Sequence, residues 1–407
     1  MVPLPGSKSV TNRLLVLAAL ADGRSRIRRP LRSRDTDLMM AALRGLGVGV
    51  TDTDDGDVLV DGVAGPLSAQ VSEIDVGNAG TVARFLPAVA CLAVGTVRFD
   101  GDPRVRERPL GPLLGALREL GADLDRVDAL PLTVRGTGCL LGGTVELDAS
   151  QSSQFVSGLL LSAPRFEQGV TVRHVGATLP SAPHLAMTVE ALRAAGAVVD
   201  DSTPGAWTVA PGPLLACDLV VEPDLSTAAA YLAAPLVAGG SVTVPGWPRG
   251  TSQPGSVLPE LLEAMGGRVS WSGDEVTVSA GDGLHGLEAD LRDAPELTLV
   301  LTALAALADS PSRLTGVAHI RVQETDRLAA LATELNKLGG DVRELPDGLV
   351  VTPRALVGGV MDSYDDHRVA MAWAVLGLGV DGVQILDVAT TRKTVPDFVG
   401  SWTRMLG

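Results

Sequence analysis

Two short segments near the start of the chain have the composition of anion-binding sites. In PGSKSVTNR at residues 5–13, a Pro/Gly turn leads into an expected helix, with Lys8 and Arg13 beside its first turn. A helix start carries free backbone N–H groups and a partial positive charge, which favour phosphate or carboxylate. GNAGT at residues 77–81 repeats the arrangement, and its glycines allow a ligand to approach the backbone closely. The ordinary structural alternatives are a capped helix with a solvated lysine and a glycine turn before a core helix.

Five further polar segments could contribute to such a site. SSQF at residues 152–155 offers hydroxyls and an amide that suit phosphate oxygens, and RVRERP at 104–109 offers forked arginines. QETDR at 323–327 combines a possible general acid with a cation, while DDHR at 365–368 and TRKT at 391–394 precede expected helices. Helix capping and surface ion pairs remain alternatives for these segments. No third ligand accompanies the Asp-Asp-His triplet, so a metal site is not predicted.

These segments are placed by a unit that recurs about every 70–75 residues. A helix-ending phrase, Leu-x-x-apolar-Gly, recurs and ends at Gly47, Gly121, Gly196, Gly266, Gly339 and, in a degenerate copy, Gly407. The glycine suits the left-handed position that closes many helices. A second marker keeps the same period, with polar residues before strongly apolar runs at Ser9, Asn78, Ser152, Ser226, Glu296 and Asp366. We expect each of these runs to form a buried helix.

Two markers in phase over the whole chain predict an α/β (α+β) fold with six copies of one unit. Alternating stretches such as VELD at residues 145–148 and VTV at 276–278 are expected to be strands. Six such units exceed one core, and the repeat is longer than that of common solenoids. We therefore expect two pseudo-symmetric domains of three units each. The predicted first lobe spans residues 7–223, and the second comprises residues 1–6 with 224–407.

Composition excludes several classes of protein. The 407 residues carry a net charge of −15, with 46% hydrophobic and 3% aromatic residues, so neither disorder nor general nucleic-acid binding is expected. Cys91, Cys139 and Cys217 match no redox or zinc spacing and are predicted to be buried, reduced thiols. The start lacks a signal-peptide pattern and no apolar run reaches membrane length, so we expect a cytoplasmic protein.

The chain contains only three lysines, Lys8, Lys337 and Lys393, beside thirty arginines. Such a bias usually reflects genome composition. Lysine is nevertheless a compact point charge and arginine a planar fork, so some sites do not accept the exchange. The three remaining lysines are therefore of particular interest.

In their order along the chain, the motifs resemble those of the EPSP synthase (5-enolpyruvylshikimate-3-phosphate synthase) family of enolpyruvyl transferases. They are PGSKSxxNR, GNAGT, RERP at 106–109, SSQF, ETDR at 324–327 and DHR at 366–368. The resemblance implies two domains, each of three βαβαββ-type units, with helix N-termini facing an inter-domain cleft. It also implies addition of the 5-hydroxyl of shikimate 3-phosphate to C2 of phosphoenolpyruvate and loss of inorganic phosphate. This is a step toward chorismate and the aromatic amino acids, and no metal or organic cofactor is implied.

The resemblance also implies which residues bind the two substrates. Shikimate 3-phosphate would contact Lys8, Ser9, Arg13, Ser152, Ser153, Gln154, Ser181, Glu296 and Gln323. Phosphoenolpyruvate would contact Lys8, Asn78, Gly80, Arg108, Gln154, Arg327, Arg368 and Lys393. The implied catalytic residues are Lys8, Glu324, which would carry the proton to and from C3, and Glu296, which would lie near the 5-hydroxyl.

We expect the second lobe to close over phosphoenolpyruvate, because exclusion of water strengthens every charge contact with the two anionic substrates. A monomer without nucleic-acid or membrane partners is expected. The sequence departs from the family pattern at Gln323, where many members have Lys and where we expect a neutral hydrogen-bond donor. It also departs at His319, where Asn is common, and at Glu296, where Asp is frequent. The first motif lies so close to the N-terminus that a leading strand would be short or absent.

Two alternatives remain open. A UDP-N-acetylglucosamine enolpyruvyl transferase shares the scaffold, but such enzymes typically carry a cysteine in the loop before the arginine assigned here, and residues 100–109 contain none. A catalytically silent anion-binding protein would be expected to lose its acid and several cations, yet Glu324, Glu296, Lys8 and Lys393 are all present. Glyphosate, a phosphonate anion, is an expected inhibitor at a site of this type.

Overall fold

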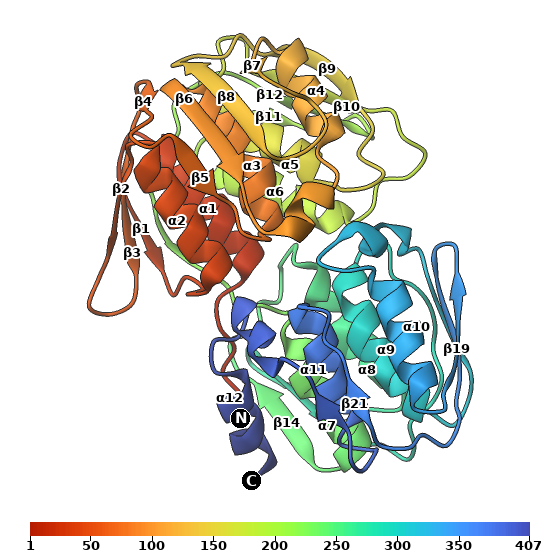
Figure 1. Cartoon of the computed structure of the whole chain (residues 1–407). Helices are drawn as coiled ribbons and strands as arrows, with labels where there is room; N and C mark the ends of the chain where they lie inside the picture. Colours follow the sequence, from red (N-terminus) through yellow and green to blue (C-terminus); the bar gives the residue numbers. More distant parts are fainter. The chain divides into compact units, whose positions relative to one another are not determined.

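The computed structural model describes all 407 residues, which divide into two compact units. The first unit consists of Gly6–Val221, and the second of Met1–Pro5 with Glu222–Gly407. Along the chain, helices alternate with strands throughout both units (Figure 1). Its helices are all too short or too polar to cross a membrane.

The first unit contains three copies of one order of elements, in which helix, strand and helix are followed by further strands. The first copy is α1 (Lys8–Leu20), β1 (Gly23–Arg28), α2 (Arg34–Gly45), β2 (Gly49–Asp52), β3 (Val58–Gly62), β4 (Leu67–Ser68) and β5 (Glu73–Asp75). The second is α3 (Gly80–Cys91), β6 (Ala93–Asp100), the 3-10 helix η1 (Pro103–Glu107), α4 (Gly111–Glu119), β7 (Asp123–Leu124), β8 (Leu132–Thr137) and β9 (Gly143–Leu147). The third is α5 (Gln154–Ser162), η2 (Ala163–Arg165), β10 (Val170–His174), α6 (Ala182–Ala194), β11 (Val199–Asp200), β12 (Ala206–Val209) and β13 (Asp218–Val220).

The second unit repeats this order, and its last copy is shortened. Its first copy is α7 (Ala228–Ala238), β14 (Ser241–Val244), η3 (Pro254–Val257), α8 (Leu258–Ala264), β15 (Arg268–Ser272), β16 (Glu275–Ser279) and β17 (Glu288–Asp290). Next come η4 (Pro295–Leu297), α9 (Thr298–Leu307), β18 (Ser312–Thr315), η5 (Ala318–Val322), α10 (Arg327–Lys337), β19 (Asp341–Leu345), β20 (Gly348–Thr352) and β21 (Val360–Met361). The last is α11 (His367–Leu376), β22 (Gln384–Ile385), η6 (Val388–Lys393) and α12 (Phe398–Leu406).

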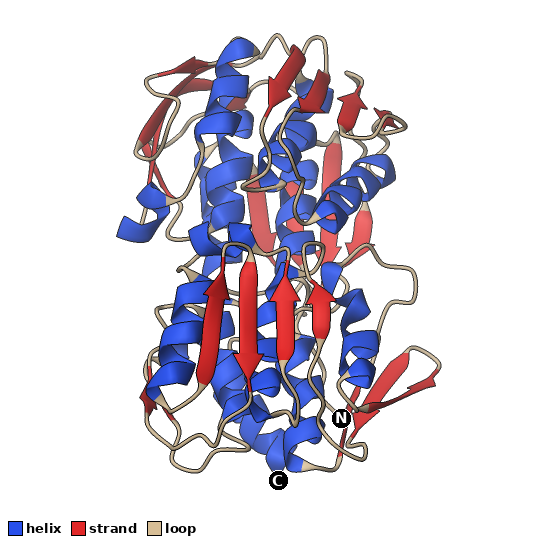
Figure 2. Cartoon of the chain, turned by 90° about the vertical axis from the view of Figure 1, so that its right-hand side faces the viewer, coloured by secondary structure: helices blue, strands red, loops and turns tan.

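The sheets share one pairing pattern. In three of them, the strand after the buried helix pairs in parallel with a strand of the preceding copy and antiparallel with a hairpin strand of its own copy. Thus β6 is parallel to β4 and β5 and antiparallel to β8, and β18 is parallel to β17 and antiparallel to β20. Figure 2 shows one of these four-stranded sheets face on, with helices behind it. Because β13 of the third copy pairs in parallel with β1 of the first, the three copies of the first unit close on one another.

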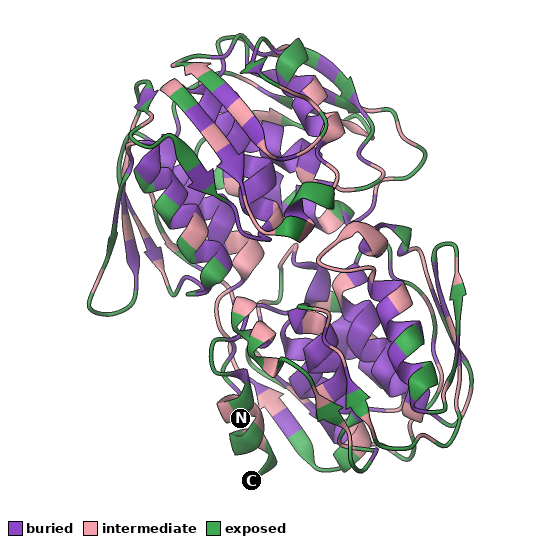
Figure 3. Ribbon diagram, viewed as in Figure 1, coloured by how far each residue is buried: buried purple, intermediate pink, exposed green.

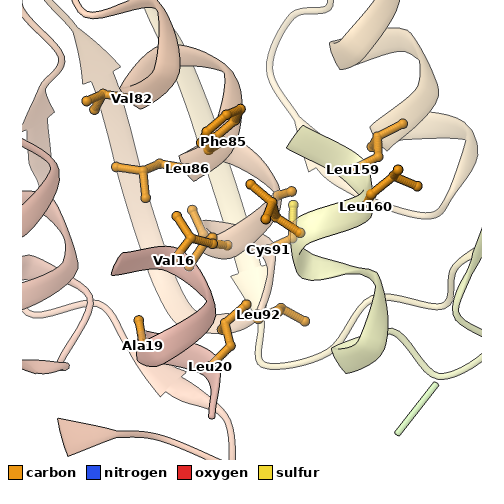
Figure 4. Packing of buried hydrophobic residues seen from close by; sticks show 14 of the residues in the cluster. Val16, Ala19, Leu20, Val82, Phe85, Leu86, Cys91, Leu92, Leu159 and Leu160 are labelled. Atoms are coloured by element: carbon orange, nitrogen blue, oxygen red, sulfur yellow. The ribbon is translucent and has the colours of Figure 1, made fainter. Parts of the chain in front are cut away.

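The recurring apolar runs form the core helices, as predicted. In the first unit α1, α3 and α5 contact one another, and in the second unit α7, α9 and α11 do so. Each is buried over most of its length (Figure 3). Side chains of α1, α3 and α5 meet in the first core, where Val16, Phe85 and Leu159 are fully buried (Figure 4). Helices that are apolar on nearly all faces need partners on all sides, which three mutually packed helices under surrounding sheets provide.

The helix-ending glycines are confirmed as well. All six have positive φ angles, between 85° at Gly196 and 111° at Gly407. The prediction of buried thiols is correct only for Cys91, where burial raises the pKa to about 12. Cys217 is partly buried, and Cys139 is exposed because it lies in the surface turn after β8.

Two glycines of the helix α4 region allow a direct test of this repeat signal. Gly121 has φ +103°, which an L side chain adopts at a cost of about 1–2 kcal/mol, whereas Gly115 lies inside α4 with open space where a side-chain methyl group would extend. Gly121→Ala should therefore lower the urea midpoint of unfolding. Gly115→Ala, the matched control, should raise the free energy of unfolding by about 0.5–1 kcal/mol through helix propensity. Equal effects of the two substitutions would contradict the assigned helix end.

Candidate active site

The start of α1 places Lys8 against a buried acid. Ser7 caps the helix, its Oγ accepting the Val10 N–H at 3.4 Å, and Lys8 is the first helical residue. Lys8 Nζ donates to Asp35 Oδ2 at 3.1 Å, and Asp35, in the first turn of α2, is 2% exposed. Asp35 was not among the predicted site residues, because its contact with Lys8 joins two helices and nothing in the local sequence pattern marks it. A buried carboxylate of this kind fixes where the lysine charge sits.

The start of α3 brings a second cation to the same region of the first unit. Asn12 Nδ2 donates to Thr81 Oγ1 at 2.6 Å, which holds the starts of α1 and α3 together. Arg108 Nη1 donates to the Asn78 backbone oxygen at 2.9 Å and to Asn78 Oδ1 at 3.2 Å. A Cβ at Gly80 would lie 2.6 Å from Arg108 Nη2 and 2.9 Å from Arg84 Nη1. A methyl group at Gly80 would therefore displace the ends of the two guanidinium groups packed over it.

Arg84 is a buried cation that the sequence analysis did not identify. It is 4% exposed, its Nη1 donates to Gln154 Oε1 at 3.0 Å, and its guanidinium carbon lies 5.4 Å from the centre of the Phe155 ring. Arg84 thus connects α3 to the start of α5. The available signal was that Arg84 is the only charged residue in the apolar sequence of α3.

The basic segment at residues 104–109 contains arginines with different environments. Arg104 pairs with Glu107 at 2.7 Å, and Arg106 pairs with Asp100 at 2.9 Å. Arg108 is 6% exposed and faces Asn78 instead. The structure therefore distinguishes the arginine implied by the resemblance from its two surface neighbours.

Arg13 lies deeper than its predicted place beside the first turn. It is 1% exposed, and its guanidinium donates to Thr188 Oγ1 at 2.8 Å, to the His184 backbone oxygen at 2.9 Å and to the Ser9 backbone oxygen at 3.0 Å. Burial beside these neutral oxygens lowers the pKa of Arg13 to about 9, so the group is still charged at neutral pH. Arg13 therefore joins α1 to α6 and keeps a positive charge beneath the helix starts.

The predicted hydroxyls lie at the starts of α5 and α6 in the same unit. Ser152 Oγ accepts the Gln154 N–H at 3.3 Å, and Ser153 is the residue that precedes α5. Ser181 precedes α6 with a left-handed φ of 55° and is buried. The contact between Arg84 and Gln154 connects this group to Gly80 and Arg108.

In the second unit, the predicted acid Glu324 lies between two cations. Glu324 Oε2 accepts from Arg327 Nη2 at 3.1 Å, and Oε1 accepts from Lys393 Nζ at 3.2 Å. The side chains of Glu324 and Lys393 are 9% and 11% exposed. Two segments far apart in sequence, the start of α10 with the residues just before it and the end of η6, therefore meet at one carboxylate.

Arg327 also bonds to Asp366, which caps α11. Arg327 Nε donates to Asp366 Oδ2 at 2.8 Å and Nη2 to Oδ1 at 3.2 Å, and both side chains are almost fully buried. Burial alone would lower the pKa of Arg327, but Asp366, Glu324 and Glu296 raise it above its ordinary value. Arg327 is therefore permanently charged, with its guanidinium plane fixed on both sides.

The remaining predicted residues surround this pair. Glu296 lies in η4 and contributes to the field at Arg327. Arg368 is the second residue of α11, and its N–H donates to Asp366 Oδ1 at 2.9 Å. His319 is buried in η5. Gln323 accepts from Arg327 Nη1 through its side-chain oxygen, and the expectation that its amide nitrogen donates to a substrate stays a prediction.

Each unit thus places cations and hydrogen-bond donors at helix starts, with carboxylates or carbonyl oxygens holding them. Such groups bind phosphate and carboxylate oxygens. The family model described as EPSP synthase (3-phosphoshikimate 1-carboxyvinyltransferase) matches residues 1–402. The chain belongs to the EPSP synthase family.

Solved structures of EPSP synthase support the same assignment. An EPSP synthase from Acinetobacter baumannii is 25% identical, with a TM-score of 0.81, and the match covers 99% of this chain and 96% of that chain. A second structure of EPSP synthase from that organism is 24% identical with a TM-score of 0.80 over the same shares. The enolpyruvyl transferase NikO from Streptomyces tendae is 21% identical, with a TM-score of 0.75 over 99% of this chain and 94% of that chain, which shows a shared fold.

Membership of the EPSP synthase family confirms the resemblance found in the sequence and the mixed α/β architecture. The chain is a transferase of the 3-phosphoshikimate 1-carboxyvinyltransferase type, which belongs to the shikimate pathway of aromatic amino-acid biosynthesis. Members of the EPSP synthase family act by enolpyruvyl transfer, so the cluster around Arg108 in the first unit and that around Arg327 in the second are candidate anion-binding sites.

Two adjacent aspartates, Asp365 and Asp366, test the buried ion pair of the second unit. Asp366→Asn removes one of the charges that hold Arg327, and we expect it to destabilise the protein by about 3 kcal/mol, as for other broken buried ion pairs. The control is Asp365→Asn, since Asp365 is exposed and has a φ of 54° that asparagine adopts readily. Differential scanning calorimetry should show a large loss for the first variant alone. Equal melting temperatures for both variants would contradict the assigned role of Asp366.

Proposed function

We propose that this chain transfers the enolpyruvyl group of phosphoenolpyruvate to the 5-hydroxyl of shikimate 3-phosphate and releases inorganic phosphate. The observation that carries the proposal is the carboxylate of Glu324, held between Arg327 and Lys393 in a chain of this family. Phosphoenolpyruvate brings a carboxylate and a phosphate, so it requires several fixed cations next to a group that can move a proton. Arg327 and Lys393 are such cations, and Glu324 is a group that can move a proton.

The proposed reaction has two steps. In the first, the 5-hydroxyl oxygen bonds to C2 of phosphoenolpyruvate while Glu324, as an acid, protonates C3, and Glu296 accepts the hydroxyl proton. In the second, Glu324 takes a proton back from C3, the C2–C3 double bond forms again, and phosphate leaves C2 with the bonding electron pair. Arg327 and Lys393 stabilise the ionised form of Glu324 between the steps, and Lys8 stabilises the negative charge of the phosphate.

The proposed contacts with phosphoenolpyruvate are divided between the units. Lys8, Asn78, Gly80, Arg108 and Gln154 belong to the first, and Arg327, Arg368 and Lys393 to the second. The two sets together supply five cationic side chains for the two anionic substrates. We therefore propose that the second unit closes over phosphoenolpyruvate after shikimate 3-phosphate has bound to the first.

Release of inorganic phosphate tests the proposed function directly. The purified chain should release phosphate only when both shikimate 3-phosphate and phosphoenolpyruvate are present, and the organic product should gain the enolpyruvyl mass. Release with UDP-N-acetylglucosamine in place of shikimate 3-phosphate would assign the sibling reaction. Binding of either substrate without release would identify a silent anion-binding protein.

Lys8→Ala and Glu324→Gln are each expected to lower kcat by about a hundredfold or more, the usual effect of losing one preorganised charge or proton donor. Glu344→Gln is the matched control for the acid, because Glu344 is exposed and pairs with Arg321 at the surface. Steady-state phosphate release measures all three. Turnover close to normal in either test variant would remove that residue from the mechanism.

Gly80→Ala tests the packing of the two arginines over the start of α3. The added methyl group would overlap Arg108 and Arg84, and we expect KM for phosphoenolpyruvate to rise by about tenfold, the equivalent of roughly 1.4 kcal/mol of lost binding. Gly111→Ala is the control, since Gly111 also begins a helix but has ordinary contacts of 3.6 Å and longer. An unchanged KM in Gly80→Ala would show that the guanidinium groups do not contact this substrate.

A further inference from the structure

The turn that carries Asp366 and Arg368 has an unusual backbone. Asp362–Asp366 connects β21 to α11, and two consecutive residues within it, Tyr364 and Asp365, have φ angles of 53° and 54°. Residues other than glycine occupy this left-handed region only where their surroundings hold them there, at a cost of about 1–3 kcal/mol for each residue. Some other part of the molecule must therefore fix this turn.

Glu334, on α10, fixes the turn through two hydrogen bonds. Its Oε2 accepts the Asp362 N–H at 2.9 Å, and its Oε1 accepts the Tyr364 hydroxyl at 2.9 Å. Glu334 is 3% exposed, so the carboxylate cannot exchange these donors freely for water. Burial raises the pKa of the Tyr364 hydroxyl to about 12, and Glu334 acts in the same direction, so Tyr364 remains a donor at any working pH.

The same helix holds the other end of the turn. Arg327 is the first residue of α10, and it bonds to Asp366 as described above. Glu334 follows it after seven residues, two helical turns later on the same face. Helix α10 therefore contacts both ends of the turn. From α11, the Trp373 indole N–H donates to the Asp362 backbone oxygen at 2.9 Å.

Lys337, the lysine without an assigned substrate contact, completes this arrangement. It lies one helical turn after Glu334, and its Nζ bonds to Glu334 Oε2. The Lys337 side chain is 46% exposed, so it neutralises the buried acid from the solvent side. A compact ammonium reaches this oxygen without displacing the two donors from the turn.

We propose that Glu334 and Tyr364 are positioning residues for enolpyruvyl transfer, and that they hold the turn at residues 362–366 so that Asp366 and Arg368 present the cations of the second unit to phosphoenolpyruvate. This inference rests on the proposed function. Neither residue contacts the substrate. Their effect passes through the backbone of the turn to Asp366, which fixes the plane of Arg327, and to Arg368, whose N–H bonds to Asp366.

The test compares Glu334→Gln and Tyr364→Phe with Lys337→Gln. Glutamine keeps one oxygen that can accept the Asp362 N–H, but it replaces the charge-assisted bond from the Tyr364 hydroxyl with a weaker neutral contact, in which the amide donates to that hydroxyl. Phenylalanine loses the hydroxyl alone. In both variants we expect KM for phosphoenolpyruvate to rise by about tenfold, as for a lost hydrogen bond to a charged group, while KM for shikimate 3-phosphate changes by less than about twofold. Lys337→Gln leaves both turn contacts in place and should retain wild-type KM values.

Amide hydrogen exchange gives a readout that does not depend on turnover. Backbone amides of residues 362–368 should exchange faster in Glu334→Gln and Tyr364→Phe but not in Lys337→Gln. Faster exchange with unchanged KM for phosphoenolpyruvate would overturn the proposal, because the residues would then be merely structural. Unchanged exchange would overturn it as well. If the wild type failed to turn over the two substrates, the proposed function would fail, while exchange would still decide whether Glu334 holds the turn.

Discussion

Burying a positive charge requires oxygen acceptors to replace water, and this constraint applies to the candidate site of each unit. Arg327 has two carboxylate partners, which raise its pKa despite burial. Arg13 is buried to the same extent with neutral oxygens around it, and burial lowers its pKa to about 9. The first arrangement satisfies the charge within the protein, whereas the second leaves a net positive field beneath the helix starts of the first unit. An anionic substrate would gain most from the second kind of site.

The repeat brings the cations of each unit together. Each copy buries one apolar helix, and the polar start of that helix emerges from the core at an equivalent place in every copy. Three helices packed on one another therefore bring their three N-terminal ends close together, although no local sequence pattern links these ends. The contact between Asn12 and Thr81 and that between Arg84 and Gln154 show this for neighbouring copies of the first unit.

Carboxylates that neutralise these cations serve different purposes. Asp35 and Asp366 are buried and hold Lys8 and Arg327 in place, whereas Glu324 also has the position of a proton carrier. Glu334 acts one step further away, on the backbone that carries Asp366. A net charge of −15 is compatible with anion binding because these acids lie behind the cations or on distant surfaces, where screening limits their effect.

The sequence by itself determined the six-fold repeat, the buried helices, the helix-ending glycines and the motif residues, because each appears as a local periodicity or as a short contiguous segment. It also indicated the family. Only the tertiary structure decided which arginine of the 104–109 segment faces Asn78, that Arg13 is buried, and that Gln323 accepts a hydrogen bond from Arg327. The contacts of Asp35 and Glu334 had no signal in the sequence, and the partner of Arg84 had none either. The physical reason is that a side-chain contact between helices depends on how those helices pack, and residues 27 to 70 positions apart leave no periodic trace of such a contact.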